Sequence, residues 1–244
     1  MIIHNKISSD KISLVVEGNI GSGKSTFLKL LNTYLAIQPV FEPHQKWQNV
    51  DGDNLLDMFY KDTERWAYTF QTYAFVSRVM EHDYYLKNSS NPVLVLERSV
   101  FSDRYCFAKN SYEMGVMNHL EWQLYKEWFA WLVYQYTTLP TGFIYLQTSP
   151  QVCYDRMRLR SRTEESAVSL DYLQMLHQKH ENWLIKKDSI DEKIKGIPVL
   201  MLQCDEDFEH NIGEQVKHIQ KIVDFFNLQT MIRKEQIALI QKQI

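Results

Sequence analysis

Residues 18–25 of this chain read Gly18-Asn19-Ile20-Gly21-Ser22-Gly23-Lys24-Ser25, which matches the pattern Gly-x-x-x-x-Gly-Lys-Ser at every fixed position. An apolar run, Ile12 to Val16, leads into this stretch, and a helical pattern, Thr26 to Leu35, leads out of it. Strand, loop and helix in this order form the setting of a phosphate-binding P-loop. The alternative, a glycine-rich turn before an ordinary helix, does not account for the four fixed positions together with both flanks.

Each part of the stretch suits a nucleoside triphosphate. The glycines let the backbone turn tightly and point N–H groups at a phosphate, and the start of the helix adds a partial positive charge. Lys24 is placed to reach the outer phosphates, and the Ser25 hydroxyl to hold Mg2+. We therefore expect the chain to bind a nucleoside triphosphate together with Mg2+.

Composition bounds the remaining possibilities. The 244 residues are 45% apolar and 23% charged, as is usual for a globular protein, and the net charge of −3 does not favour nucleic-acid binding. Cys106, Cys153 and Cys204 lie far apart and are expected to be reduced core thiols. No apolar run approaches membrane-spanning length, and about eleven residues precede the first strand. We expect no membrane span, no targeting segment and a cytoplasmic location.

The order of the predicted elements indicates the fold. Short apolar strands are expected at 12–16, 39–41, 93–96, 142–146 and 198–202, and helices at 26–35, 54–60, 64–86, 102–113, 119–136, from 150 onward, 170–187 and 210–227, with a loop over 44–53. This alternation predicts an α/β fold, a parallel sheet of five strands with helices on both faces. We expect one domain over 1–226, a lid at about 156–166 and a C-terminal helical extension over 227–244.

Three charged residues are predicted at the carboxyl edge of this sheet, where ligands bind in such folds. Glu42 follows the second strand and could orient a hydroxyl that attacks the γ-phosphate and take its proton late; a solvated loop acid is the alternative. Glu97 and Arg98 end the third strand. Glu97 could hold the Mg2+ shell and Arg98 could neutralise phosphate charge, or the two could form a strand-end salt bridge.

Two helices carry further candidates. Arg156 and Arg160 share one helix face, and Arg162 lies just beyond, so the segment could close over a triphosphate; a solvated basic helix end is the alternative. Gln71 and Arg78 lie on nearly one face of the long helix. The Gln71 amide offers a donor and an acceptor, which matches the edge of a base, while aromatic residues such as Tyr60 and Phe70 could sandwich a ring.

Other residues give weaker signals. His177 and His180 are three positions apart on a predicted helix, with Glu181 next to them, which is a weak metal signal without a further ligand, so we do not expect a metal there. Trp122, Trp128 and Trp131 are expected to pack in the core or on an oligomer face.

Seven motifs in order resemble one family. They are Glu17-Gly18-Asn19-Ile20, Glu42-Pro43, Glu64-Arg65-Trp66, Thr69-Phe70-Gln71-Thr72-Tyr73, Glu97-Arg98-Ser99, Ser102-Asp103-Arg104-Tyr105 and Tyr145-Leu146-Gln147. From about residue 11 to 226 the chain resembles the deoxyribonucleoside kinases, the family of deoxycytidine, deoxyguanosine and mitochondrial thymidine kinases. The resemblance implies an α/β P-loop kinase fold with a five-stranded parallel sheet. It also implies a homodimer that transfers the γ-phosphate of ATP to the 5′-hydroxyl of a deoxynucleoside in nucleotide salvage.

The resemblance also implies roles for particular residues. Glu42 becomes the base at the 5′-hydroxyl, Glu97 a magnesium-side carboxylate and Arg98 a contact of both phosphate and substrate. Tyr60 and Glu165 match the pair that holds the sugar 3′-hydroxyl, and Gln71 matches the reader of the base edge. The resemblance implies that Trp47, Phe70 and Phe107 form the slot for the base. It also implies that ATP contacts the P-loop up to and including Thr26, the lid arginines Arg156, Arg160 and Arg162, and Asp207 with Phe208.

Substrate choice is predicted from Arg78 and Asp103. Purine- and cytosine-using members of the family have an Arg and an Asp at these positions, where thymidine-using members have apolar residues. The pair would fill the space that a thymine methyl needs. We expect deoxyadenosine, deoxyguanosine and deoxycytidine as substrates, with purines slightly ahead and thymidine poor.

Three other functions fit parts of the sequence. A thymidylate-type nucleoside monophosphate kinase shares the P-loop and an Asp-Arg-Tyr sequence. Such an enzyme must neutralise an acceptor phosphate, whereas Gln71, Tyr60 and Glu165 suit a neutral sugar and base. A GTPase would carry an Asn-Lys-x-Asp stretch, which this sequence lacks. A catalytically dead structural subunit would be expected to lose Lys24 or Glu42, and both are present.

The tail beyond Phe226 is less informative. Ile237, Ile240 and Ile244 give it a weak apolar stripe. It could form a helix that packs on the body or on a partner, or a frayed end.

Overall fold

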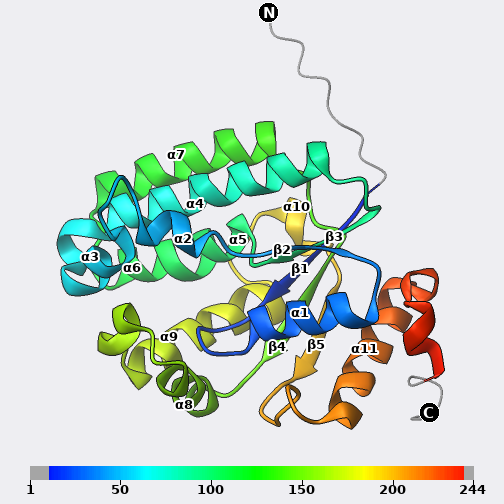
Figure 1. Ribbon diagram of the computed structural model, residues 1–244. Coiled ribbons are helices and arrows are strands. Elements are labelled where there is room, and N and C mark those ends of the chain that lie inside the picture. The colour runs from blue at the N-terminus through cyan, green and yellow to red at the C-terminus, as the bar shows by residue number, and fades with distance from the viewer. Residues whose placement is uncertain (1–10, 239–244) are drawn as a thin grey trace, which may run out of the picture.

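A five-stranded parallel sheet forms the centre of the molecule (Figure 1). The computed structural model describes residues 11–238. The strands are β1 (Ile12–Glu17), β2 (Gln38–Val40), β3 (Val93–Glu97), β4 (Gly142–Gln147) and β5 (Val199–Gln203), in the spatial order β2-β3-β1-β4-β5. The predicted fold class is confirmed, and β1, β3 and β4 are almost wholly buried, as their continuous apolar runs indicated.

Strand register brings the candidate residues to one edge. Val16 of β1 is aligned with Glu97 of β3, and Glu17 of β1 with Tyr145 of β4. The segment after β1 is the P-loop, and the segment after β3 is Arg98-Ser99. Because parallel strands end at the same edge, residues that are about 80 positions apart in the chain become neighbours there.

Helices cover both faces of the sheet (Figure 1). Helices α1 (Lys24–Tyr34) and α11 (Ile212–Phe226) pack on one face around Phe27, Leu31 and Ile219. On the other face, α4 (Thr63–Asn88), α7 (His119–Tyr136) and α9 (Leu170–His180) enclose a second core. The other α-helices in the described part of the chain are α2 (His44–Gln48), α3 (Leu55–Lys61), α5 (Val100–Ser102), α6 (Lys109–Glu113), α8 (Pro150–Arg160) and α10 (Glu192–Lys195). A π-helical turn at Asp103–Ala108 joins α5 to α6, a second one at Glu181–Ile185 continues α9, and a 3-10 turn at Thr163–Ala167 precedes α9. Among the residues described, no helix combines the length and the apolar character that crossing a bilayer requires.

The prediction of a loop over 44–53 is wrong in its first half, because residues 44–48 form α2. Polar composition suggested the loop. The helix is instead stabilised by packing on α4. Its residue Trp47 is buried and donates from its indole Nε1 to Ser77 Oγ of α4 at 2.8 Å. Tertiary packing therefore decides the local structure here.

The described part of the tail lies against α1. Residues 229–231 and 234–236 form two short 3-10 turns, and Ile232 forms an antiparallel bridge with Leu35. Arg233 donates from its backbone to Tyr34 O and from its side chain to Asn32 O. Ile237 is 40% exposed, while Ile240 and Ile244 lie outside the described residues.

Candidate active site

The P-loop is held in shape from beneath. At Gly21, where φ is +78°, an added Cβ would lie 2.1 Å from the Cys153 carbonyl oxygen of α8. At Gly23, where φ is +89°, it would lie 2.7 Å from the Phe208 ring. Glycine is required at both positions, because any side chain would collide with its support and would also disfavour the left-handed backbone. This geometry leaves the N-terminus of α1 open to a phosphate.

Two P-loop side chains, Lys24 and Ser25, define the phosphate end of the site together with Glu97 of β3. Lys24 is buried and donates to Asn19 O at 2.6 Å, and burial together with nearby Arg98 lowers its pKa to about 7. The Ser25 hydroxyl donates to Glu97 Oε1 at 2.6 Å. A hydroxyl and a carboxylate side by side offer oxygen ligands of the kind that Mg2+ prefers, so this pair fits the predicted metal site.

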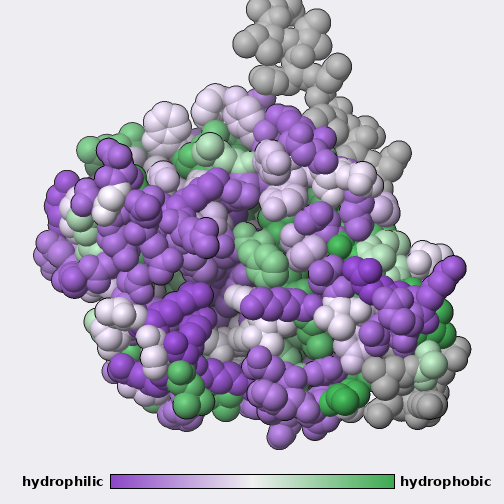
Figure 2. Space-filling model, viewed as in Figure 1, coloured by the Kyte–Doolittle hydropathy of each residue, from purple (hydrophilic) through white to green (hydrophobic). Residues whose placement is uncertain are grey.

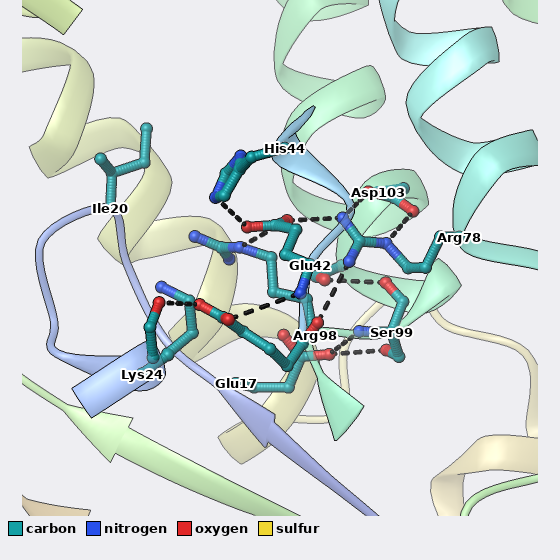
Figure 3. Close-up of polar contacts among 12 residues, drawn as sticks. Glu17, Ile20, Lys24, Glu42, His44, Arg78, Arg98, Ser99 and Asp103 are labelled. Atoms are coloured by element: carbon teal, nitrogen blue, oxygen red, sulfur yellow. Dashed lines mark hydrogen bonds and ion pairs between the residues drawn. The ribbon is translucent and has the colours of Figure 1, made fainter. Parts of the chain in front are cut away.

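Glu42 lies at the centre of a buried charge cluster (Figure 3). Its Oε1 is 2.6 Å from Arg78 Nη2 and 3.4 Å from Arg98 Nε, and its Oε2 is 3.1 Å from His44 Nε2. Burial on its own would raise the pKa of the Glu42 carboxyl. Arg78, His44 and Arg98 together outweigh burial and hold that pKa well below its ordinary value, so the carboxylate is ionised and is a weak base. The alternative of a solvated loop acid does not describe Glu42, whose side chain is 7% exposed.

Arg98 is held in an uncommon backbone conformation. Its φ is +63°, in the left-handed region that non-glycine residues rarely adopt. The flanking contacts fix it: Arg98 N donates to Val16 O at 2.9 Å, and Ser99 donates from its backbone N and its hydroxyl to Glu17 Oε1 at 2.9 and 2.6 Å. The result is that the Arg98 guanidinium lies over the Phe107 ring, 4.7 Å from its centroid, and faces Glu42.

Glu17 is a member of this site that the sequence did not single out as a functional residue. It is fully buried, and its Oε2 has no hydrogen-bond partner among the described residues. Burial raises the pKa of the Glu17 carboxyl to about 7, although Arg98 and Ser99 act in the opposite direction. A buried carboxyl that fixes the Arg98-Ser99 turn depends on a three-dimensional contact between β1 and β3.

A cavity of about 300 Å3 adjoins both the P-loop and Glu42. Most of the predicted site residues form its walls: Ile20, Gly21, Gly23, Lys24, Ser25, Thr26, Glu42, Trp47, Tyr60, Phe70, Gln71, Arg78, Glu97, Arg98, Asp103, Phe107, Arg160, Arg162 and Glu165. Figure 2 shows mainly hydrophilic residues around a hollow between the α2–α3 region and α8. The predicted phosphate and nucleoside residues therefore share one continuous space.

The inner end of the cavity is flat and aromatic. Phe70 stacks on Phe59 with ring centroids 4.6 Å apart and meets the edge of Trp47 at 5.7 Å. The Gln71 side chain lies in the wall beside them. Flat apolar faces with one amide group suit a planar ring that has hydrogen-bonding groups at its edge.

Arg78 and Asp103 form a two-pronged ion pair in the wall. Arg78 Nε donates to Asp103 Oδ2 at 2.8 Å, and Nη2 donates to Asp103 Oδ1 at 3.1 Å. Arg78 also donates from Nη1 to Glu97 O and from Nη2 to Glu42 Oε1. Burial would lower the pKa of Arg78, but Asp103 and Glu42 outweigh it and raise that pKa. Arg78 therefore connects the base pocket to Glu42, a link that the sequence did not predict.

The arginines of the 156–166 segment divide into two groups. Arg160 and Arg162 line the cavity and contact Glu165, with Arg160 Nη2 2.6 Å from Glu165 Oε2 and Arg162 Nη1 3.4 Å from Glu165 Oε1. Arg156 instead donates to the carbonyls of residues 204–206 and lies over the Phe208 ring.

Six predicted ATP-binding residues do not line this cavity. They are Gly18, Asn19 and Ser22 within the P-loop, together with Arg156, Asp207 and Phe208. Asn19 shapes the loop by donating to Leu173 O at 2.8 Å, and Phe208 is a buried support beneath Gly23. Conversely, Lys29, His44, Leu56, Phe59 and Tyr172 form walls that the sequence did not assign to the site.

The fold and the site define a P-loop phosphotransferase with a nucleoside-sized pocket beside its phosphate loop. The family model for deoxynucleoside kinase matches residues 14–227, and the chain belongs to that family. It is therefore an ATP-dependent kinase, and the family match supports the nucleoside kinase prediction rather than the thymidylate-type monophosphate kinase.

Individual relatives agree with this assignment. The chain is 42% identical over 238 residues to the mitochondrial deoxyguanosine kinase of Xenopus laevis, a match that covers 86% of this chain and 89% of the relative. It is 42% identical over 234 residues to deoxycytidine kinase 2 of Gallus gallus, with 86% and 88% covered. A probable deoxycytidine kinase of fowlpox virus is 42% identical over 227 residues, with 92% and 89% covered.

Proposed function

We propose that this chain transfers the γ-phosphate of ATP to the 5′-hydroxyl of deoxyadenosine, deoxyguanosine and deoxycytidine, and that it uses thymidine poorly. One observation carries the proposal: a single cavity has the P-loop at one end and Gln71 with aromatic faces at the other, and Glu42 stands in its wall. A hydroxyl held at Glu42 would face a phosphate held at Lys24.

Phosphoryl transfer is assigned to the charge cluster. Glu42 orients the 5′-hydroxyl and accepts its proton late, since its lowered pKa makes it a weak base early in the reaction. Lys24 and Arg98 stabilise the charge on the phosphates. Ser25 and Glu97 would hold Mg2+, which when bound would neutralise phosphate charge as the bond to the leaving group breaks.

Recognition of the nucleoside is assigned to the inner part of the cavity. Gln71 would bind the base edge, while Trp47, Phe70 and Phe107 would flank the ring. Tyr60 and Glu165 would hold the sugar 3′-hydroxyl. Both side chains are in the cavity wall, and Glu165 is fixed by its ion pairs with Arg160 and Arg162.

Base choice is assigned to the Arg78–Asp103 pair. The pair is buried and joined by two hydrogen bonds, so separating it to admit a thymine methyl would leave an uncompensated charge. A cytosine lacks the methyl group, and a purine could offer an acceptor such as N7 toward Arg78.

The segment at about 156–166 is proposed to be a lid over the triphosphate. Arg160 and Arg162 already face the cavity, and Ser161 between them adopts a left-handed conformation, with φ +54°, that ends α8. Arg156, Asp207 and Phe208 would contact ATP outside the described cavity, on the side of the donor base.

A homodimer is also proposed, through the outer faces of α4 and α7. These faces expose large apolar side chains: Met80, Tyr84, Leu120, Leu124, Trp128, Trp131 and Tyr134. Contiguous exposed aromatic residues mark interaction surfaces. A cytoplasmic location stays a prediction, and one relative is named as mitochondrial.

The test is a coupled assay with ATP and Mg2+ in which the four deoxynucleosides and thymidine monophosphate are offered separately. We expect turnover of the two purine deoxynucleosides and deoxycytidine, at least tenfold lower kcat/KM for thymidine, and none for the monophosphate. Thymidine as the best substrate would overturn the base assignment. Preference for the monophosphate would overturn the nucleoside kinase assignment.

A further inference from the structure

His44 connects the candidate catalytic carboxylate to the lid. It follows Glu42-Pro43 and opens α2. Its Nε2 lies 3.1 Å from Glu42 Oε2 and 3.3 Å from Arg162 Nη1, and Figure 3 shows the imidazole turned toward Glu42. The Trp47 ring packs against the imidazole at a centroid distance of 5.0 Å, which restricts its orientation.

One nitrogen cannot satisfy both of these neighbours at the same time. If Nε2 carries a hydrogen, it can donate to Glu42 but cannot accept from Arg162. If Nε2 carries a lone pair, it can accept from Arg162 but then faces the Glu42 carboxylate without a hydrogen. Nδ1 has no hydrogen-bond partner among the described residues, so the choice between the tautomers is made by the two contacts of Nε2. Glu42 and Arg162 therefore compete for His44.

The remaining contacts of Glu42 show what this competition would change. Its Oε1 is held by Arg78 and Arg98, from α4 and from the end of β3. Its Oε2 has His44 as its side-chain contact among the described residues. Without a donor at Oε2, the carboxylate could turn about its Cγ–Cδ bond, and the oxygen that meets the 5′-hydroxyl would be less well placed.

We propose that His44 is a positioning residue that couples the lid to Glu42. When Arg162 leaves His44 for the triphosphate, the imidazole, whose side chain is 25% exposed, can exchange its hydrogen with water and change to the tautomer that carries it on Nε2. Nε2–H then donates to Glu42 Oε2 and fixes the carboxylate. When the lid is without a triphosphate, Arg162 occupies Nε2 and Glu42 is less constrained. The proposal rests on the proposed function, because it needs Glu42 at the hydroxyl and Arg162 at the phosphates.

Two substitutions separate the effect of the His44 hydrogen bond from the effect of its ring packing. His44→Phe keeps a ring against Trp47 but removes the hydrogen bond, and we expect kcat to fall roughly tenfold, with a smaller change in the KM for the nucleoside. His44→Gln offers a separate donor and acceptor, so it should recover kcat to within about threefold of the parent enzyme. A role in packing alone predicts the opposite order, with Phe better tolerated than Gln.

A double-mutant cycle tests the coupling itself. Arg162→Ala removes a phosphate contact but also frees His44 to donate to Glu42, so part of the loss is offset. In the His44→Phe background that offset is absent, and Arg162→Ala should lower kcat/KM by about threefold or more beyond its effect in the parent enzyme. Arg160→Ala is the matched control, because Arg160 contacts Glu165 on the same segment and has no described contact with His44. Its effect should be the same in both backgrounds.

The outcomes are distinguishable. An unsubstituted enzyme that phosphorylates no deoxynucleoside would refute the proposed function. An active enzyme in which His44→Phe keeps full kcat, or in which Arg162 and Arg160 show equal coupling to His44, would refute the role of His44 alone. If His44→Phe fails to fold by circular dichroism, the cycle is run with His44→Gln, for which the same non-additivity is expected because the amide no longer has to choose between its neighbours.

Discussion

Glu17→Gln should make the protein less sensitive to alkaline pH. In the folded state burial raises the pKa of the Glu17 carboxyl to about 7, from an ordinary value of 4.5. The folded protein therefore binds this proton more tightly than the unfolded chain does. Stability that comes from Glu17 is greatest below pH 4.5, is lost as the pH rises toward 7, and stays at its lowest level above that.

The size of the effect follows from the two pKa values. A shift of one unit corresponds to about 1.4 kcal/mol, and the part of the shift that is titrated between about pH 5 and pH 8 amounts to about 2.5 kcal/mol. The glutamine side chain of the variant would be neutral throughout, and its amide oxygen could still accept from the Ser99 N–H and hydroxyl. Any constant cost of placing an amide nitrogen at the unpartnered Oε2 position cancels when the two pH values are compared.

The assay is urea unfolding of both proteins at about pH 5 and pH 8, without nucleotide. The unfolding free energy of Glu17→Gln relative to the parent protein should rise by about 2.5 kcal/mol between these two pH values. Glu64→Gln, at an exposed carboxylate in the first turn of α4, is the control and should show no such change. A relative stability of Glu17→Gln that is equal at both pH values would show that the Glu17 carboxyl is not protonated on folding.

Four further outcomes are expected. Glu42→Gln should leave nucleoside affinity nearly intact and lower kcat by about 10^2 to 10^4, and unchanged turnover would remove Glu42 from the mechanism. Proteolysis near Arg160 should slow when ATP and Mg2+ are added, whereas a segment that stays open would be cut at the same rate. Sedimentation at micromolar concentration should show a dimer that Trp128→Glu converts to a monomer, and a monomeric parent protein would contradict the proposed interface. Arg78→Met combined with Asp103→Ala should raise the kcat/KM ratio of thymidine to deoxycytidine at least tenfold, while kcat falls for every substrate because Glu42 loses its Arg78 contact; an unchanged ratio would contradict the assigned role.

The features that the sequence predicts correctly depend on residues that are close together in the chain. The P-loop, the buried strands and the glycines are each specified by neighbouring residues, and the parallel sheet follows from their alternation. Glu42 and Arg98 could be placed at the sheet edge for the same reason, since each closely follows a strand.

What could not be predicted depends on partners distant in sequence. Glu17 is recognised as a site residue only once Ser99 lies beside it across β1 and β3. Arg78 is predicted to line the base pocket, but its link to Glu42 is seen only once its guanidinium meets that carboxylate. Residues 44–48 form a helix that is stabilised by the hydrogen bond from Trp47 to α4, and this helix places His44 in the site. No periodicity or motif within 44–48 carries that information.

The contact between Gly21 and Cys153 gives α8 a mechanical role. The Cys153 carbonyl in the first turn of this helix lies so close to Gly21 that no side chain fits between them, and the last residue of the helix is Arg160. An 11-residue helix is about 16 Å long, so α8 spans the distance between the P-loop and the arginines that face the phosphate site. Adding or removing one residue within α8 would rotate the position of Arg160 by about 100° around the helix axis. The length of α8 therefore sets where Arg160 stands relative to the P-loop.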